Sequence, residues 1–539
     1  GGMITPAPRL DDVVPLEPAT MPGRVVVQWD KDDCAGLGIV KVDLLGLGMM
    51  SVIQDSLALV RERGGDVDLA RLPPDDPAVY RSLQEADTIG VFQVESRAQM
   101  ATLPRVRPER FYDLVVQVAI IRPGPIVGDM VHPYIRRRRG REPVTYPHPS
   151  LEPILRRTLG VPLFQEQLLR MAMVTAGFTA TEAEELRRAF GFKRSERLMA
   201  EVETKLRAGM ARQGIHGAAA EEIVHAITAF ALYGFPESHA SSFALLAYAS
   251  AYLRVHHPAA FYAALLNNQP MGFYHPATIV KDAQRHGLRI RPIDVTRSEW
   301  LCVIEPDDTG LTVRLGLRYV RGLREPAGRA LVAARLARPF DSVHDLVRRV
   351  RLERDELETL AAVGALAPFG RTRRANLWTV AVSSPGPLFE DPPREESPLS
   401  EMTEIERLAA DYAGTSVTLG RHPMALRRAA LRHAGVLSAR ELAGVEDGAR
   451  VQVAGSVIVR QRPGTAKGFV FLSLEDETGI ANVIVTPPNF ARHRLTLVAE
   501  PYLLVEGIAQ RQDGVISVRA TRARGLPALG HHVPSHDFG

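Results

Sequence analysis

The spacing of apolar residues divides the chain into three stretches with different periods. Near the start, residues 24–30 (RVVVQWD) and 38–45 (GIVKVDLL) are apolar runs of strand length. Residues 49–290 mainly carry helical spacing, as in 50–63 (MSVIQDSLALVRER). Residues 448–520 change to alternation, with five strand-like runs separated by turn residues. This order of elements predicts a multi-domain α+β fold.

Changes of pattern and composition also predict domain boundaries. The five short strands fit a small Greek-key barrel of the OB type. A stretch rich in proline, serine and acidic residues, 381–400, indicates a linker. The predicted regions are a sheet portion at 1–48, a helical domain at 49–290, a region of short elements and helical hairpins at 291–380, the linker with a small helical segment at 381–447, the OB-type barrel at 448–527 and a tail at 528–539.

Two helix starts carry capping residues. Thr181 and Glu184 have the spacing of a capping box, and Ser238 is placed to cap a helix at 239–257. Because a helix N-terminus presents free N–H groups and the positive end of its dipole, the second start is also a candidate phosphate site. The alternative there is an ordinary serine cap beside an exposed His239.

Composition narrows the class of protein without deciding its function. The 539 residues are 45% hydrophobic and 24% charged, as in ordinary globular proteins, and no apolar run suits a membrane helix. Two distant cysteines, Cys34 and Cys302, exclude a disulfide scaffold and a cysteine zinc site, and favour the cytoplasm. The net charge is +4, and most basic residues are arginine. Arginine suits phosphate contact, although a GC-rich genome gives the same bias.

One charged pair interrupts the apolar run at 38–45. Side chains alternate between the two faces of a strand, so Lys41 and Asp43 share one face and Val40, Val42 and Leu44 the other. A carboxylate on a mostly buried strand is costly unless it binds a metal or a partner charge. The sequence leaves two possibilities open, namely a metal ligand and an Asp–Lys ion pair at a sheet edge.

Two basic segments are candidate phosphate contacts. Residues 185–194 (ELRRAFGFKR) place Arg187, Arg188 and two further cations within three helical turns. Residues 134–142 (YIRRRRGRE) could contact a nucleic-acid backbone. A solvated helix face is the alternative for the first segment and a flexible loop for the second. The arginines of the second segment are Arg136, Arg137, Arg138, Arg139 and Arg141.

Residues 314–335 have the pattern of a helix-hairpin-helix. Their Gly322 turn would bring backbone N–H groups to a DNA phosphate without reading sequence. Residues 357–370 read as a degenerate second copy. A plain αα-hairpin without a ligand is the alternative.

The barrel carries candidate nucleic-acid contacts on its second strand and in the loop before it. Aromatic stacking beside a basic groove suits a single-stranded template, whereas alternating phenylalanines can equally belong to the core. These candidates are Phe469, Phe471, Arg460, Arg462 and Lys467.

Several stretches in a fixed order resemble the bacterial C-family DNA polymerases, which include the alpha subunit of DNA polymerase III. They are QWDKDD, GIVKVDLLGL, GVFQVESRAQM, IRPGPI, LFQEQLLRMA, ELRRAFGFKR, YGFPESHASSFALLAY and FVFLSLEDETGIANVIV. Their common order across nearly the whole chain is specific. The resemblance implies that 1–48 is the C-terminal remnant of a polymerase palm, that 49–290 form large helical fingers, that 291–380 form a helix-hairpin-helix region, and that an OB-type β-barrel follows.

The resemblance gives Asp43 a role in two-metal nucleotidyl transfer. The family's site uses three aspartates, a D-x-D pair on one strand and a third on a neighbouring strand, and Asp43 matches the third. Two Mg²⁺ ions would act on the primer 3′-hydroxyl and the triphosphate, and Lys41 would neutralise phosphate charge or steady the carboxylates. The D-x-D strings at 30–32 and 66–68 lie in loop contexts. We therefore expect the pair upstream, the chain to be the C-terminal half of a polymerase, and this fragment alone to bind primed DNA without extending it.

The resemblance also implies nucleotide contacts. In the family, the basic fingers segment contacts the incoming triphosphate, and a Tyr and a His around a later helix start lie near the nucleotide. An Arg in the IRPGPI turn is expected to face the active site. The implied residues are Arg187, Arg188, Tyr233, Ser238, His239 and Arg122.

Two parts of the chain help to distinguish the branches of this family, namely the segment after the barrel and the linker. The replicative alpha subunit continues past its barrel into a domain that binds the tau subunit, whereas only a short tail follows the barrel in this sequence. We therefore expect the error-prone branch of the family. That branch acts in DNA-damage tolerance, mutagenesis and translesion synthesis with ImuA and ImuB. Residues 384–389 (SPGPLF) lie where the family carries a sliding-clamp peptide but lack its first Gln. Clamp binding is therefore expected to be indirect, through ImuB. The alternatives are a non-catalytic DNA-binding scaffold and a fragment of a replicative alpha subunit.

Overall fold

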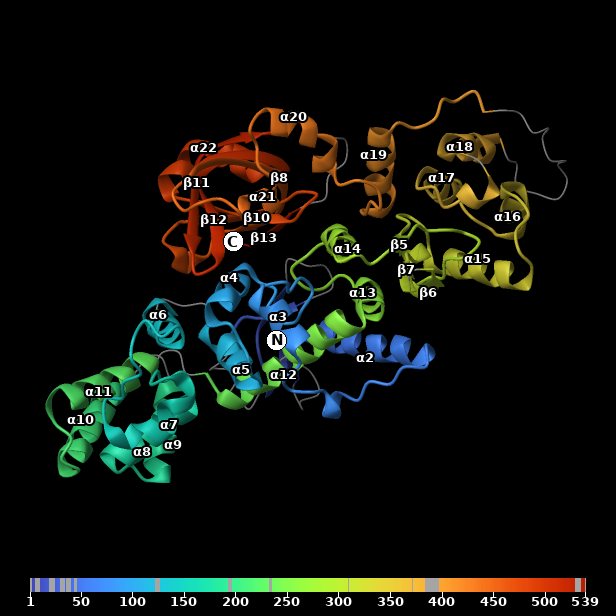
Figure 1. Ribbon diagram of the computed structural model, residues 1–539. Coiled ribbons are helices and arrows are strands. Elements are labelled where there is room, and N and C mark those ends of the chain that lie inside the picture. The colour runs from blue at the N-terminus through green and yellow to red at the C-terminus, as the bar shows by residue number, and fades with distance from the viewer. Residues whose placement is uncertain are drawn as a thin grey trace. The chain divides into compact units, whose positions relative to one another are not determined.

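The computed structural model of the chain contains two compact units (Figure 1). One comprises Gly1–Met50 and Ile126–Ser242, and the other Ser51–Pro125 and Phe243–Gly539. None of the described helices is long and apolar enough to cross a membrane. The structure describes all residues except 1, 5–9, 19–24, 30–33, 35–39, 43–45, 122–126, 192–195, 232–234, 309, 371, 383–396, 529–534 and 539. It describes the backbone alone at 2–4, 10, 40–42, 127–132, 187–191, 196–199, 229–231, 465, 536 and 538.

Both predicted N-terminal strands are present, and each is short. After η1 (Leu10–Asp12), β2 (Leu16–Pro18) pairs antiparallel with β3 (Val25–Val27). In the second pair, β1 (Gly2–Ile4) is antiparallel to β4 (Val40–Val42). The described parts of this segment therefore form two separate two-stranded sheets, because each predicted strand pairs with a more N-terminal neighbour.

A helical bundle forms the rest of the first unit. Its elements are α6 (Val127–Arg138), η3 (Pro149–Leu151), α7 (Glu152–Leu155), η4 (Arg156–Thr158), α8 (Gln165–Ala176), α9 (Ala180–Gly191), α10 (Glu196–Arg212), α11 (Gly217–Ala231) and the start of α12 (Glu237–His256). Leu168, Met171, Leu206 and Ile223 are fully buried between them. Gly209 lets α10 approach α8 closely, since a Cβ there would lie 2.1 Å from the carbonyl oxygen of Ala176.

Both predicted helix caps need correction. The capping box before α9 uses Thr179 and Glu182, two residues earlier than predicted, with the Glu182 carboxylate accepting from the Thr179 N–H at 2.9 Å. Ser238 lies inside the first turn of α12 and does not cap it. The Glu237 N–H donates instead to a carboxylate oxygen of Glu166 at 2.9 Å. A long-range contact therefore replaces the local cap that the sequence suggested.

The second unit begins with helices arranged around a buried centre. Its first elements are α2 (Leu47–Glu62), which starts in the other unit, η2 (Leu69–Arg71), α3 (Pro77–Gln84), α4 (Arg97–Val106), α5 (Phe111–Ile120), α13 (Pro258–Asn267) and α14 (Pro276–Arg285). From Ala259 to Leu266, α13 is buried on all sides, as a helix that is apolar all round should be. A small sheet follows, in the order β5 (Ile290–Arg291), β7 (Gly310–Arg314) and β6 (Val303–Asp307).

The predicted hairpin region consists of short helices. They are η5 (Leu317–Tyr319), α15 (Glu325–Ala337), α16 (Val343–Arg349), α17 (Arg354–Ala362), η6 (Ala367–Phe369), α18 (Arg373–Val382) and, beyond the linker, α19 (Glu404–Thr415). The first arm of the first hairpin is a three-residue 3₁₀ turn, η5.

The C-terminal barrel is closed, as its alternating pattern predicts (Figure 1). Neighbouring strands follow the order β11-β12-β10-β9-β8, and β11 also pairs with β8. Leu472, Val483, Leu503 and Val518 are fully buried inside. The elements are η7 (Pro423–Leu426), α20 (Arg428–His433), α21 (Ala439–Leu442), β8 (Arg450–Gln461), η8 (Gly464–Ala466), β9 (Val470–Glu475), β10 (Ile480–Val485), α22 (Pro487–Ala499), β11 (Tyr502–Gln512), β12 (Val515–Gly525) and, within the predicted tail, β13 (His536–Phe538).

Candidate nucleotide and nucleic-acid site

The candidate catalytic strand is partly described. Lys41 lies in β4, opposite Met3 of β1, which agrees with its predicted strand position. Asp43 lies outside the described residues, as do the aspartates at 30–32. At the other D-x-D string, Asp68 caps η2 by accepting from the Ala70 N–H at 2.9 Å. That string is therefore a loop and a local cap, as its sequence context predicts.

Four of the predicted nucleotide residues belong to α9 and α12, namely Arg187, Arg188, Ser238 and His239. The backbone of Arg187 and Arg188 belongs to α9, but their side chains lie outside the described part of the chain. Arg122 and Tyr233 lie wholly outside it. The ring of His239 lies 5.2 Å from that of Phe235. Since the first N–H of α12 already bonds the Glu166 carboxylate, a phosphate at this helix start would compete with that carboxylate.

The arginine-rich segment ends α6, so the flexible-loop alternative is wrong for this part of it. Arg136 and Arg137 each donate through Nε to the Glu142 carboxylate, at 2.8 and 3.1 Å. These two hydrogen bonds lower the pKa of Glu142. Arg137 also donates to the carbonyl of Leu159 at 2.8 Å. Two of the predicted DNA contacts therefore hold the local fold, while Arg138 ends the helix and Arg139 lies in the following turn.

The turn at Gly322 is exposed and takes a left-handed backbone conformation. Gly322 lies between η5 and α15 with φ +84°, and in the described structure its N–H donates no hydrogen bond. The turn is fastened to the second hairpin through Glu356, which accepts from the backbone N–H and the Nε of Arg324, both at 2.9 Å. Hydrogen bonds from Arg324 lower the pKa of the Glu356 carboxyl to about 2. The two hairpins are therefore linked, and the loop tip stays accessible.

Replacing Gly322 with alanine should weaken DNA binding through the backbone alone. A Cβ at this position meets nothing within 4 Å, so the expected cost of ~1 kcal/mol comes from the left-handed φ. DNA affinity, measured by fluorescence anisotropy, should fall several-fold. Gly444→Ala is the matched control, because Gly444 is exposed and has no positive φ. Equal affinities for the two variants would contradict a role of the Gly322 turn in binding.

The predicted barrel residues are largely engaged within the protein. Arg460 donates to the carbonyls of Leu497 at 2.8 Å and Glu500 at 2.6 Å. The guanidinium of Arg462 stacks 5.0 Å above the ring of Phe490. Lys467 takes a left-handed backbone conformation in the loop before β9, and Phe469 lies just ahead of that strand.

Phe471 faces a residue that sequence reasoning missed. The Arg97 guanidinium lies 4.9 Å from the centre of the Phe471 ring. Its Nη1 donates to the carbonyls of Leu472 and Val483, both at 3.0 Å. Arg97 begins α4, almost four hundred positions away along the chain. No local signal in the sequence connects two segments so far apart.

Glu475 is a second missed residue, buried where β9 meets α14. Its carboxylate accepts from Arg285 Nη2 at 2.7 Å and Thr278 Oγ1 at 3.0 Å, and His422 Nε2 lies 3.9 Å away. Burial alone would raise the pKa of Glu475, but His422 and Arg285 lower it to about 2. No local pattern in SLEDET, residues 473–478, marks a buried carboxylate, so only the fold identifies this ion pair.

Among the described residues, one group has ligands suited to a metal ion: Asp87, Asp282 and His286. Arg254 already lies among them, with Nη2 2.6 Å from Asp87 Oδ1 and 3.2 Å from Asp282 Oδ2. Burial by itself would raise the pKa of Asp87, but the hydrogen bond from His286 and the charge of Arg254 hold it well below its usual range. The guanidinium supplies the positive charge, and the group is an ion-pair network of the fold.

Comparison with protein families divides the chain in the same order as its fold. Residues 1–46 match the bacterial DNA polymerase III alpha NTPase domain, and 49–214 match the finger domain of the same subunit. Residues 287–376 match a helix-hairpin-helix motif, and 447–524 an OB-fold nucleic acid binding domain.

Similarity to individual proteins extends over nearly the whole chain. The error-prone DNA polymerase of Anaeromyxobacter dehalogenans is 51% identical over 96% of this chain. The chain belongs to the family of bacterial error-prone DNA polymerases. The relative from Methylococcus capsulatus is 48% identical and that from Mycobacterium bovis 50% identical, each over 100% of this chain.

The chain spans about half the length of these curated relatives, namely 48%, 54% and 50%. Among solved structures, the asparaginyl-tRNA synthetase of Pyrococcus horikoshii aligns with 18% of this chain and 24% of its own, at 25% identity and a TM-score of 0.15. That similarity is too low to carry any argument about the fold or function of the present chain.

Proposed function

We propose that the complete protein is an error-prone, DNA-directed DNA polymerase that transfers nucleotides from deoxynucleoside triphosphates to a primer 3′-hydroxyl. The observation that carries this proposal is the identity of about half of all residues, over nearly the whole chain, with proteins named error-prone DNA polymerase. The finger, hairpin and OB-fold matches support it, because each supplies a part that a polymerase needs to hold nucleotide and DNA.

Asp43 is the proposed catalytic carboxylate of this chain. Carboxylate oxygens are the ligands that Mg²⁺ prefers, so the residue type fits two-metal chemistry. When bound, the two ions would lower the pKa of the primer hydroxyl and stabilise charge on the triphosphate. Lys41 of β4, two positions earlier in the sequence, is proposed to hold phosphate charge beside that carboxylate.

The nucleotide-binding residues are proposed from the fingers segment and the start of α12. Arg187 and Arg188 lie on α9 within the matched finger domain, and guanidinium forks suit phosphate oxygens. The other proposed residues are Arg122, Tyr233, Ser238 and His239, of which the last two belong to the first turn of α12.

DNA contacts are proposed at two places outside the nucleotide site. The N–H of Gly322 would bind a phosphate of the duplex, as expected for a helix-hairpin-helix turn. The arginine-rich end of α6 would contact the same backbone.

The physiological setting is proposed from the error-prone branch as a whole. We propose action in DNA-damage tolerance, mutagenesis and translesion synthesis in the cytoplasm, with ImuA and ImuB as partners. The sliding clamp would be reached through ImuB, because the SPGPLF segment at 384–389 lacks the Gln of a clamp peptide.

Primer extension tests this function against the scaffold alternative. The complete polymerase containing this sequence should extend a primer with Mg²⁺, on an intact template and on one with an abasic site, with frequent mispairs. A scaffold would retain primed DNA in a gel-shift assay without extending it. That second result would exclude the polymerase assignment.

A further inference from the structure

Three arginines line the outer surface of β12. Arg519, Arg522 and Arg524 are all exposed, whereas Ala520 and Ala523 between them are buried in the barrel core. Residues two apart on a strand are ~7 Å apart. The three guanidinium groups therefore form a narrow basic row along a single strand, which we call the β12 arginine row.

A β-bulge brings the three arginines to one face. Glu506 of β11 pairs with Arg522 and Gly507 with Ala520, which leaves Thr521 as the extra residue. Without that residue, side chains at odd and even positions would point to opposite faces of the sheet. Arg519 would then lie on one face, and Arg522 and Arg524 on the other. Gly507 permits the close approach at this point, since a Cβ there would lie 2.4 Å from the carbonyl oxygen of Arg519.

The β12 arginine row is not used by the fold. In the described structure, no hydrogen bond or ion pair involves these three guanidinium groups. Other barrel arginines are anchored: Arg460 bonds two carbonyls, and Arg511 donates to the carbonyl of Val445 at 3.3 Å. Three exposed, like-charged side chains in a row repel one another, so an anionic ligand would relieve a cost that the barrel otherwise carries.

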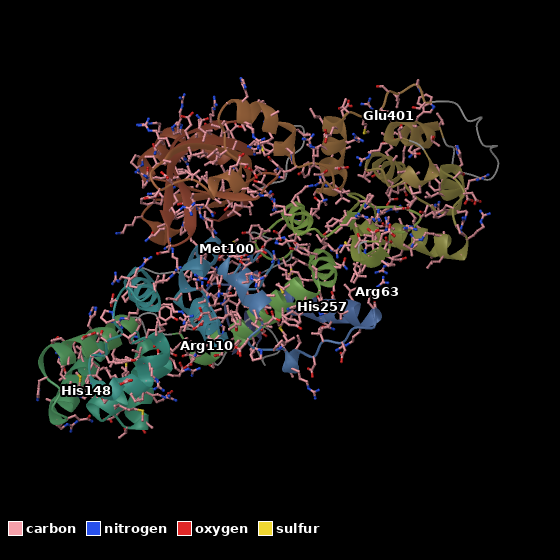
Figure 2. All side chains as sticks on the ribbon, viewed as in Figure 1. Arg63, Met100, Arg110, His148, His257 and Glu401 are labelled. Atoms are coloured by element: carbon pink, nitrogen blue, oxygen red, sulfur yellow. The ribbon has the colours of Figure 1, made fainter. Side chains whose placement is uncertain are left out.

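The face on which OB-folds usually bind, strands two and three, is occupied here by other parts of the same unit. Arg97 of α4 covers Phe471, and Arg285 of α14 is paired with Glu475. Met100 of α4, labelled in Figure 2, lines a groove with Ile480 and Ile516 of the barrel. The usual ligand face is therefore a contact surface within the unit. Ile516, near the start of β12, lines the same groove, whereas Arg519, Arg522 and Arg524 farther along β12 are exposed.

The neighbours of the row suit one nucleic-acid strand. Ile484 of β10 and Ile508 of β11 flank Arg519 in register, and both are half-buried. Their aliphatic surfaces would contact bases while the arginines hold phosphates. Glu506 of β11 is paired in register with Arg522, and in the described structure it forms no ion pair with that arginine. Its negative charge confines the positively charged surface to β12.

We propose that the β12 arginine row binds the phosphodiester backbone of a single-stranded nucleic acid, independently of sequence. The proposal deepens the proposed polymerase function, on which its biological meaning rests, by naming the barrel surface that holds the unpaired template. Three cations in line, open to solvent and bordered by apolar side chains, are the features that such binding requires.

Salt-dependent binding of oligodeoxythymidylate to the 539-residue chain tests the row. In Arg519→Gln/Arg522→Gln/Arg524→Gln, the slope of log affinity against log salt should fall by about 2, since each lost single-strand phosphate contact removes about 0.7. Affinity at low salt should fall at least tenfold. The matched control is Arg61→Gln/Arg81→Gln/Arg440→Gln, three exposed arginines elsewhere, which should keep both slope and affinity.

Further variants and ligands separate charge from folding and DNA from RNA. Arg519→Lys/Arg522→Lys/Arg524→Lys should restore the slope, and oligouridylate should behave like the DNA strand because phosphates are the contacts. A primed template should lose affinity in the glutamine variant, and a blunt duplex should not. An unchanged slope, equal loss in the lysine variant, or equal loss on blunt duplex would overturn the proposal. Failure of the unaltered chain to bind any DNA would contradict the polymerase function itself.

Discussion

Asp43→Asn should abolish nucleotide incorporation by the complete polymerase. The amide keeps the size of the carboxylate but removes the negative charge that holds a divalent ion, so the attacking hydroxyl and the triphosphate lose their shared charge stabilisation. The single-turnover rate of primer extension with Mg²⁺ should fall by about a thousandfold or more. DNA affinity should be kept, because the loss of one negative charge adds no repulsion toward the phosphate backbone.

Asp66→Asn is the matched control for this experiment. Asp66 is an exposed loop aspartate in a D-x-D string, and its carboxylate forms no hydrogen bond or ion pair in the described structure, so this variant should extend primers at the parent rate. If Asp43→Asn also extends at that rate, Asp43 is not a catalytic residue. If the Asp66 variant is the inactive one, the D-x-D string at 66–68 has a catalytic role that its position in a loop does not suggest.

Glu475→Gln should loosen the barrel from α14. The side chains of Glu475 and Arg285 are 4% and 16% exposed, and removing one charge of a buried pair leaves the other uncompensated, at a cost of ~3–5 kcal/mol. Hydrogen exchange of the β9 and α14 amides measures this loss as a lower free energy of local opening. Glu446→Gln, at an exposed position where the carboxylate has no hydrogen-bond or ion-pair partner among the described residues, should leave exchange unchanged. Equal exchange in both variants would show that the ion pair does not hold the barrel in place.

The same carboxylate gives the parent protein a dependence on pH. Because the folded pKa of Glu475, about 2, lies below its ordinary value of 4.5, its contribution to stability is complete above pH ~4.5 and is lost as pH falls toward 2. The β9 and α14 amides of the parent should therefore lose protection over this interval, and those of Glu475→Gln should lose less. A parallel pH dependence in the two proteins would assign the acid sensitivity to other groups.

The sequence determined the class and order of the elements. Alternation over 448–520 sufficed for the barrel, because one buried face per strand fixes the period. The order of the family stretches sufficed to assign the family, which the relatives confirm. Lys41 was also placed correctly on a strand.

Only the tertiary structure decided which charged residues are available for binding. Local spacing suggested Ser238 as a cap and Arg460 as a DNA contact, but Glu166 takes the helix end and barrel carbonyls take the guanidinium. Arg97 reaches Phe471 from a distant helix, and one extra residue at Thr521 turns three arginines to the same face. Hydrophobic periodicity is a local property of the chain, whereas the partner of a charge depends on which distant segments meet. The sequence therefore specified the elements and the family, and the packing specified which of their cations remain open to a ligand.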